Sequence, residues 1–213
     1  MGILLKLVRE KSHAEMLLQG KLFMRPAAYY HYLEKGQGDN LEGIITLDNA
    51  IYIKAECPIY CMCSYCDDEI KNGYLNISNQ CINEFNCFNG FAVILDWKKF
   101  EERLPSLNCN GHKYVYQRVE YKISRGLEDY LDIVEPKNQE IMKPLFIKHP
   151  FFSHQKEYRI AVDDPLYEGL FPDNDVHITY SFPMNLKDIG YYIYIPEYLS
   201  KDGVLHIPVA NHK

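Results

Sequence analysis

The sequence predicts a single α+β domain over residues 1–213, built on mixed, mostly antiparallel sheets with a few short helices. Three observations lead to this fold class. Apolar runs of strand length outnumber segments with helical spacing, the helical segments cluster early in the chain, and no stretch resembles a linker. A chain of 213 residues can bury a sizeable core, so one domain is the simplest expectation.

The first elements read as strand, helix, strand, helix. Residues 3–8 form an apolar run of strand length, and Ser12 with Glu15 three residues later has the spacing of a capping box, which predicts a helix from about 13 to 18. Gly20 ends this helix, and residues 21–24 follow as a second strand. Pro26 suits the first turn of a second helix, over residues 27–33.

The rest of the chain predicts mostly strands. The clearest is the apolar run 91–95, after which Asp96 caps a short helix. Residues 126–142 have helical spacing and predict one or two helices. The other predicted strands form a hairpin of 44–47 with 50–53, and then cover residues 58–65, 114–123, 157–162, 176–180, 191–195 and 204–207.

Composition narrows the function classes. The net charge is −6 and the basic residues are scattered, which argues against broad nucleic-acid binding. No apolar run approaches the roughly 18 to 20 residues that span a bilayer. The first residues lack the order of a secretory signal, so a cytoplasmic protein is expected. The many tyrosines suit half-buried strands or a ligand surface.

Seven cysteines without a secretion signal predict reduced thiols. Four of them, Cys57, Cys61, Cys63 and Cys66, are enough for a tetrahedral zinc, but structural zinc sites usually take two close pairs from separate turns. Cys61 and Cys63 lie two apart in a predicted strand and point to one face, as small buried side chains do. No metal is expected, and zinc bound by these thiols stays the alternative.

One carboxylate stands out as a candidate functional group. The sequence contains no GxSxG, HExxH or Walker motif, and its cysteines and histidines form no nucleophile pattern. Glu157 opens an apolar strand after a polar turn, at a sheet end where ligand crevices tend to lie, and Arg159 projects from the same face. The alternative is a structural cross-strand ion pair of Glu157 and Arg159. A second acidic spot comprises Asp39 and Glu42.

The order of short motifs over residues 3–165 resembles a group of uncharacterised bacterial and phage proteins that share a domain of unknown function. Its members show an opening LYKY strand, FNDPFEG, a GvcIgFd strand and EKEYR; this chain has LLKLV, GDNLEG, GFAVILD and QKEYR. Gly38 and Asn40 replace the Asn and Pro of FNDPFEG. The matching positions are Lys6, Asp39, Glu42, Gly43, Gly90, Asp96, Lys156, Glu157, Tyr158 and Arg159.

The same order is similar to a degenerate ADP-ribosyltransferase, which implies a split-sandwich arrangement and NAD as substrate. On this resemblance Tyr29 or Tyr30 would stack on nicotinamide, and Glu157 would hold the ribose hydroxyl and stabilise an oxocarbenium-like transition state. Arg9 or Arg25 would clamp the pyrophosphate. The first strand departs from the family pattern, because it offers Lys6 and then Arg9 in place of its Arg or His.

A different function class is also consistent with the sequence. A small acidic protein with many tyrosines suits a non-catalytic binding or inhibitory factor, phage-borne or related to defence, that grips a protein or a nucleotide. This hypothesis predicts no NAD turnover, whereas the transferase hypothesis predicts release of nicotinamide. The oligomeric state is not determined by the sequence.

Overall fold

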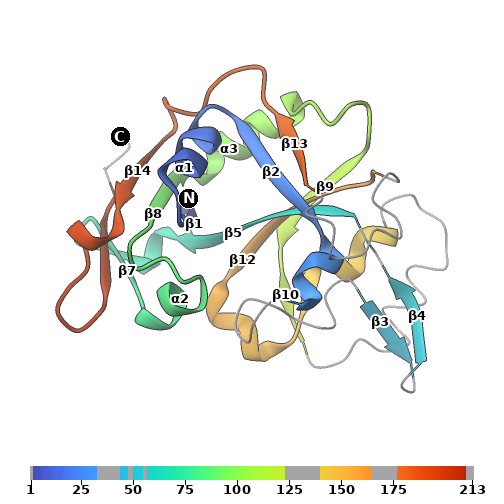
Figure 1. Cartoon of the computed structure of the whole chain (residues 1–213), viewed down its shortest axis with the longest axis horizontal. Helices are drawn as coiled ribbons and strands as arrows, with labels where there is room; N and C mark the ends of the chain where they lie inside the picture. Colours follow the sequence, from blue (N-terminus) through green and yellow to red (C-terminus); the bar gives the residue numbers. More distant parts are fainter. Residues whose placement is uncertain are drawn as a thin grey trace. The chain divides into compact units, whose positions relative to one another are not determined.

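The structure of this chain is a computed structural model that describes residues 2–32, 44–47, 50–54, 57–122, 140–164 and 177–209 (Figure 1). The chain divides into two compact units, and each combines separate stretches of sequence. Unit 1 comprises Met1–Leu22, Met62–Asn108 and Ser181–Lys213. Unit 2 comprises Phe23–Cys61 and Cys109–Tyr180.

Unit 1 is built on antiparallel strands whose spatial order is β5 (its second half), β1, β8 and β14. Leu5 of β1 faces Cys63 of β5 on one side and Ile94 of β8 on the other. Strands β1 and β8 are mainly apolar, because side chains on both of their faces are buried. The bounds are β1 Gly2–Val8, β5 Pro58–Cys66, β8 Phe91–Asp96 and β14 Gly190–Tyr194.

A three-stranded sheet completes the core of unit 1. Its order is β15, β7, β6, with bounds Leu205–Pro208, Tyr74–Ile77 and Ile70–Lys71. Leu75 and Ile207 of this sheet share one buried cluster with Leu5 and Ile94 of the larger sheet. The helices of this unit are α1 Lys11–Leu18, α2 Asn79–Glu84 and α3 Trp97–Arg103, with 3-10 turns η2 Asp67–Glu69, η3 Leu104–Ser106 and η7 Ile195–Glu197.

Unit 2 holds the candidate carboxylate. Its strand order is β13, β2, β5 (its first half), β12 and β9, with a parallel pair β10 and β11 and a hairpin of β3 and β4. A small core packs Ala27, Ile59, Leu145, Phe146 and Ala161 together. The strand bounds are β2 Lys21–Pro26, β3 Ile44–Leu47, β4 Ala50–Lys54, β9 Tyr114–Arg118, β10 Glu120–Tyr121, β11 Ile147–Lys148, β12 Glu157–Val162 and β13 Ile178–Ser181. The 3-10 turns are η1 Ala27–Tyr32, η4 Glu140–Phe146 and η5 Pro150–Gln155.

The predicted fold class is confirmed: the chain is α+β, with mostly antiparallel pairing and a few short helices. The strand over residues 157–162 has the predicted bounds, and Asp96 caps α3 by accepting a hydrogen bond from the Lys99 amide at 3.0 Å. None of the helices in the described part of the chain is long and apolar enough to cross a membrane.

Two predictions about local structure are wrong in detail. Helix α1 begins at Lys11 with Glu10 at the N-cap and no side-chain cap, so Ser12 lies inside the first turn. The predicted helix after Pro26 is a 3-10 helix over Ala27–Tyr32. It follows β2 directly and carries aromatic residues, which lose side-chain freedom in an α-helix. The predicted helices over 126–142 fall mostly outside the described residues.

Candidate functional site

Glu157 lies in a buried cluster of charged side chains in unit 2. It is the first residue of β12, and its side chain is only 6% exposed. Its Oε1 accepts a hydrogen bond from Lys148 Nζ at 2.5 Å. Its Oε2 accepts from Arg159 Nε at 2.7 Å and lies 2.6 Å from Arg159 Nη2. Both carboxylate oxygens therefore face buried cations.

These cations keep Glu157 ionised. Burial by itself raises the pKa of this carboxyl group, but the charges of Arg159 and Lys148 and their hydrogen bonds outweigh it and lower the pKa to about 2. Glu157 is consequently an anion throughout the neutral pH range. Without these partners a carboxylate at this depth would tend to take up a proton.

The backbone around Glu157 is held by two residues of one neighbouring segment, Val119 and Tyr121. Its amide donates a hydrogen bond to the Tyr121 hydroxyl at 2.8 Å, and its carbonyl accepts one from the Val119 amide at 2.8 Å. Lys156, which precedes it, has a left-handed backbone with φ of 47°. This residue turns the chain from η5 into β12 and so fixes the direction in which the strand begins.

Sequence reasoning missed Lys148 and Gln155. Lys148 belongs to β11, is 2% exposed, and donates a second hydrogen bond to Gln155 Oε1 at 2.9 Å. Its ammonium also lies 4.6 Å from the centre of the Phe152 ring. The available signal was the position of Lys148 directly after the apolar run Leu145–Ile147, since a lysine that continues a buried run needs a partner.

Arg159 is the second buried cation of the cluster. It is 1% exposed, and its Nη1 donates a hydrogen bond to the Leu145 carbonyl. The predicted ion pair with Glu157 is present, but it runs along one strand between residues two apart, not across two strands. The alternation of a strand therefore placed the two side chains on one face, as expected.

A second group of predicted residues lies on β2 and η1 of unit 2. The Arg25 guanidinium lies over the Tyr29 ring, 4.2 Å from its centre, and 5.4 Å from the centre of the Phe23 ring. Tyr30 meets Tyr29 edge to face at 5.5 Å. Arg25 and Tyr29 are thus brought together, and a cation already lies over the Tyr29 ring.

The remaining predicted site residues are distributed elsewhere. Lys6 and Arg9 belong to unit 1, so the predicted site is not gathered within one unit. The positive charges of these two residues act on Cys87, although burial dominates there and raises the pKa of that thiol to about 11. Asp39 and Glu42 lie outside the described residues.

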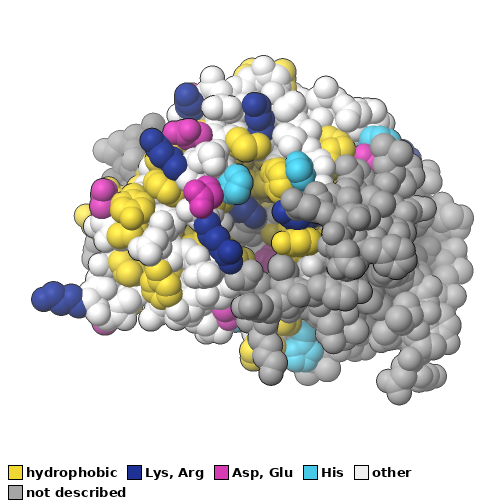
Figure 2. Space-filling model, in the orientation of Figure 1, with side chains coloured by type: hydrophobic (Ala, Val, Ile, Leu, Met, Phe, Trp, Pro, Cys, Tyr) yellow, Lys and Arg dark blue, Asp and Glu magenta, His cyan; other side chains and the backbone are white. Residues whose placement is uncertain are grey.

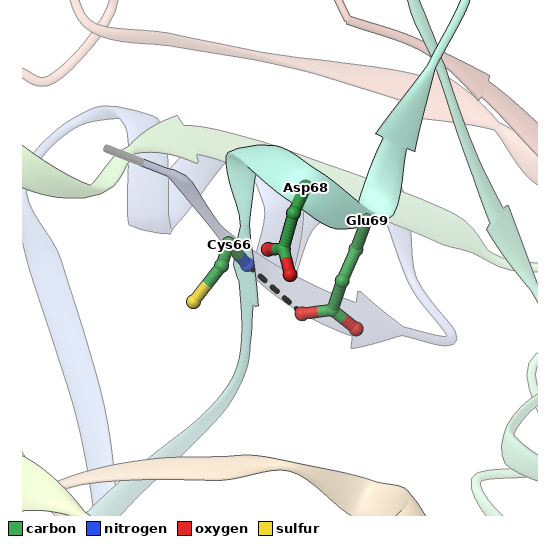
Figure 3. Close-up of side chains that lie close together, drawn as sticks. All are labelled: Cys66, Asp68 and Glu69. Carbon is green, nitrogen blue, oxygen red and sulfur yellow. Dashed lines mark hydrogen bonds between the residues drawn. The ribbon is translucent and has the colours of Figure 1, made fainter.

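The cysteines in β5 and directly before it are mostly packed as apolar side chains. Cys63 belongs to the buried core of unit 1, and Cys57 and Cys61 pack against that of unit 2. Only one group in the described ranges has three metal-ligating atoms close together: Cys66, Asp68 and Glu69, within 4.8 Å of one another (Figure 3). Glu69 also accepts a hydrogen bond from the Cys66 amide at 3.0 Å, which gives this carboxylate a structural role in the turn.

Comparison with protein-family models, with curated proteins and with solved structures finds no match for this chain.

Proposed function

We propose that this chain is an ADP-ribosyltransferase-like protein that uses NAD, with Glu157 as its central carboxylate. The observation that carries the proposal is the buried, ionised state of Glu157 between Lys148 and Arg159. A buried ion cluster is costly, and well-packed apolar residues in its place are often as stabilising or more so. Perturbed carboxylates of this kind are concentrated at functional sites.

The proposed reaction uses the Glu157 carboxylate to hold a ribose hydroxyl. An ionised carboxylate offers about four acceptor positions, and Lys148 Nζ, Arg159 Nε and Arg159 Nη2 occupy three of them. One position remains for a ribose hydroxyl. As the bond between the ribose and nicotinamide breaks, nicotinamide leaves with the electron pair, and the carboxylate holds a hydroxyl of the oxocarbenium-like sugar. Lys148 and Arg159 together outweigh the charge of Glu157, so stabilisation of the sugar's positive charge requires at least one of these cations to turn away from Glu157 when NAD binds. An acceptor nucleophile then bonds to the sugar and loses its proton.

A second function is supported by the same contacts. Because both oxygens of Glu157 are already bound to cations, the carboxylate can act purely to hold Lys148 and Arg159 in place. The chain would then be a non-catalytic binding or inhibitory protein that grips a nucleotide or a protein partner. The two functions differ in one measurable property, the release of nicotinamide.

The test begins with the wild-type chain and NAD. NAD at 100 times its dissociation constant stabilises a folded protein by about 2.7 kcal/mol, which raises the melting temperature of a chain of this length by roughly 5 to 10 °C. We expect this rise together with release of nicotinamide. A rise without release supports the binding function, and no rise with no release refutes both the NAD proposal and the transferase.

Variants then locate the site. Glu157→Asp keeps the charge and shortens the side chain by one methylene, so it is expected to fold and to lose most of the nicotinamide release. Glu102→Gln is the matched control, because Glu102 is 61% exposed and its nearest cation, Lys98, is 3.8 Å away. Equal activity in Glu157→Asp and the wild type would rule out Glu157 as the central carboxylate.

A further inference from the structure

Three Asn–Gly pairs occur in the chain, and two of them lie in unit 1 in contrasting environments. The first is Asn72–Gly73 at the tip of the hairpin of β6 and β7, and the second is Asn89–Gly90 directly before β8. An asparagine followed by glycine is chemically labile, because the backbone nitrogen of the next residue can attack the asparagine side chain and glycine has no side chain to hinder it. The two pairs share this chemistry, so any difference between them comes from the structure.

The Asn72–Gly73 pair forms an exposed two-residue turn. Lys71 faces Tyr74 across the hairpin, and the φ angles of Asn72 and Gly73 are 53° and 78°, both positive as a type I′ turn requires. Asn72 is exposed, and a Cβ built on Gly73 would meet no atom within 4 Å. In the described part of the chain, neither the Asn72 side chain nor the Gly73 amide takes part in a hydrogen bond. On the left of Figure 2, in the orientation in which Figure 1 draws β7, the surface shows polar atoms in white and a basic side chain in dark blue that projects into solvent.

The tip of this hairpin can also open locally. Strand β6 is only two residues long and is an edge strand of the three-stranded sheet, paired with β7. Short edge strands and loop tips belong to the least stable parts of a protein, where local opening costs little free energy. Opening matters because the peptide between Asn72 and Gly73 must rotate out of the turn before its nitrogen faces the Asn72 side chain.

The Asn89–Gly90 pair is held on both sides of its glycine. The Gly90 amide donates a hydrogen bond to the Cys87 carbonyl at 2.9 Å, and the Gly90 carbonyl accepts one from the Ile195 amide at 3.0 Å. Gly90 is buried, and a Cβ at this position would lie 2.3 Å from the Val8 carbonyl oxygen. The Gly90 nitrogen therefore cannot approach the Asn89 side chain unless these hydrogen bonds break.

From these differences we infer that Asn72 is a site of spontaneous deamidation, whereas Asn89 is protected by the fold. The Gly73 nitrogen bonds to Asn72 Cγ and loses its proton, and the Cγ–Nδ2 bond breaks as ammonia leaves. The resulting five-membered succinimide takes up water at either carbonyl and opens to aspartate or to isoaspartate. Water is the only co-reactant, and nothing is oxidised or reduced. The inference goes beyond the proposed function and does not rest on it, since it requires neither Glu157 nor NAD.

The products alter the turn in two ways. Both add a carboxylate, and isoaspartate also lengthens the backbone by one methylene group, so that a two-residue type I′ turn no longer fits. The Gly73 carbonyl, which accepts a hydrogen bond from the Val209 amide at 2.8 Å, is then displaced. Faster hydrogen exchange of the Val209 amide in the isoaspartate form is therefore expected, and exchange at the wild-type rate would contradict this consequence.

The experiment incubates the whole chain at pH 8 and 37 °C, both native and unfolded in guanidinium chloride, and follows the two Asn–Gly pairs of unit 1 by peptide mass spectrometry. Carboxyl methylation by an isoaspartate-specific methyltransferase then counts the isoaspartate product. In the native chain we expect Asn72 to react at least about tenfold faster than Asn89, because Asn89 reacts only when its surroundings open. In the unfolded chain the two rates should become similar.

Variants test the attacking group. Gly73→Ala places a methyl group on the attacking residue and should slow the reaction of Asn72 several-fold. Gly111→Ala is the matched control, because a Cβ there also meets no atom within 4 Å and Gly111 lies in unit 2, so Asn72 should react at the wild-type rate. The inference is overturned if Asn72 stays intact in the native chain while the unfolded chain is converted, or if Asn72 and Asn89 react at equal rates in the native chain. Either result leaves NAD cleavage at Glu157 separately testable by nicotinamide release.

Discussion

Replacement of Glu157 by glutamine tests the buried charge cluster most directly. The substitution preserves the shape of the side chain but removes its negative charge. Lys148 and Arg159 then remain, 2% and 1% exposed, without the anion that lay between them. The new amide also turns its NH2 group towards one of the two cations, so that a donor faces a donor.

The expected loss of stability follows from these contacts. Removing one partner of a buried ion pair costs about 3–5 kcal/mol, because the partner's charge stays buried and uncompensated. Here two cations lose the same anion, so the upper part of this range is expected. A native protein is stabilised by only about 5–15 kcal/mol, which makes the change easy to measure.

Urea unfolding at pH 7, followed by circular dichroism, provides the assay. The free energy of unfolding of Glu157→Gln is compared with that of the wild type and of Glu102→Gln, whose exposed side chain should change it by less than about 0.5 kcal/mol. Adding Lys148→Met to Glu157→Gln should recover part of the loss, since it removes one of the two buried cations that Glu157 no longer neutralises. A Glu157→Gln protein within about 1 kcal/mol of the wild type would refute the cluster.

Three further predictions concern acidity, thiols and packing. The pKa of Glu157 is lowered to about 2 in the folded chain from an ordinary 4.5, so this group contributes about 3 kcal/mol of stability that is present above pH 4.5 and is lost as the pH falls towards 2. About 2 kcal/mol of this should be lost between pH 5 and pH 3, so urea titrations at these two pH values should show a loss of stability larger by this amount in the wild type than in Glu157→Gln. Burial raises the pKa of the Cys109 thiol to about 11, as it does for Cys87. In the native protein at pH 8, a thiol reagent should therefore label the half-buried Cys57, Cys61 and Cys66 quickly. The buried thiols should be labelled only after the protein is unfolded. Gly90→Ala should lower the free energy of unfolding in urea by about 1–3 kcal/mol, because its Cβ would lie 2.3 Å from the backbone carbonyl oxygen of Val8. Gly73→Ala is the control: its Cβ meets no atom within 4 Å, so the only cost is that of a positive φ in a residue with a side chain.

The amino-acid sequence by itself determined the local elements whose patterns are unambiguous. The apolar run 91–95 and the mainly apolar segment 157–162 form strands as predicted, and their side chains are largely buried on both faces. Successive side chains of a strand point to opposite faces, so Glu157 and Arg159, two residues apart, lie on the same face. Their ion pair could therefore be predicted from the sequence. The α+β class followed from the number and order of such runs.

Only the tertiary structure decided what surrounds Glu157. Lys148 reaches the carboxylate from β11, and Gln155, at the end of η5, accepts a second hydrogen bond from Lys148. Tyr121 reaches the backbone of Glu157 from β10. Propensity and periodicity act over a few neighbouring residues, so they carry no information about which lysine of the chain lies beside a given carboxylate. The stacking of His177 on Phe23 joins residues more than 150 positions apart, so local sequence patterns could not predict it either. Such contacts form only when distant segments pack against each other. Their energies depend on how deeply the groups are buried, and that depth is set by several segments together.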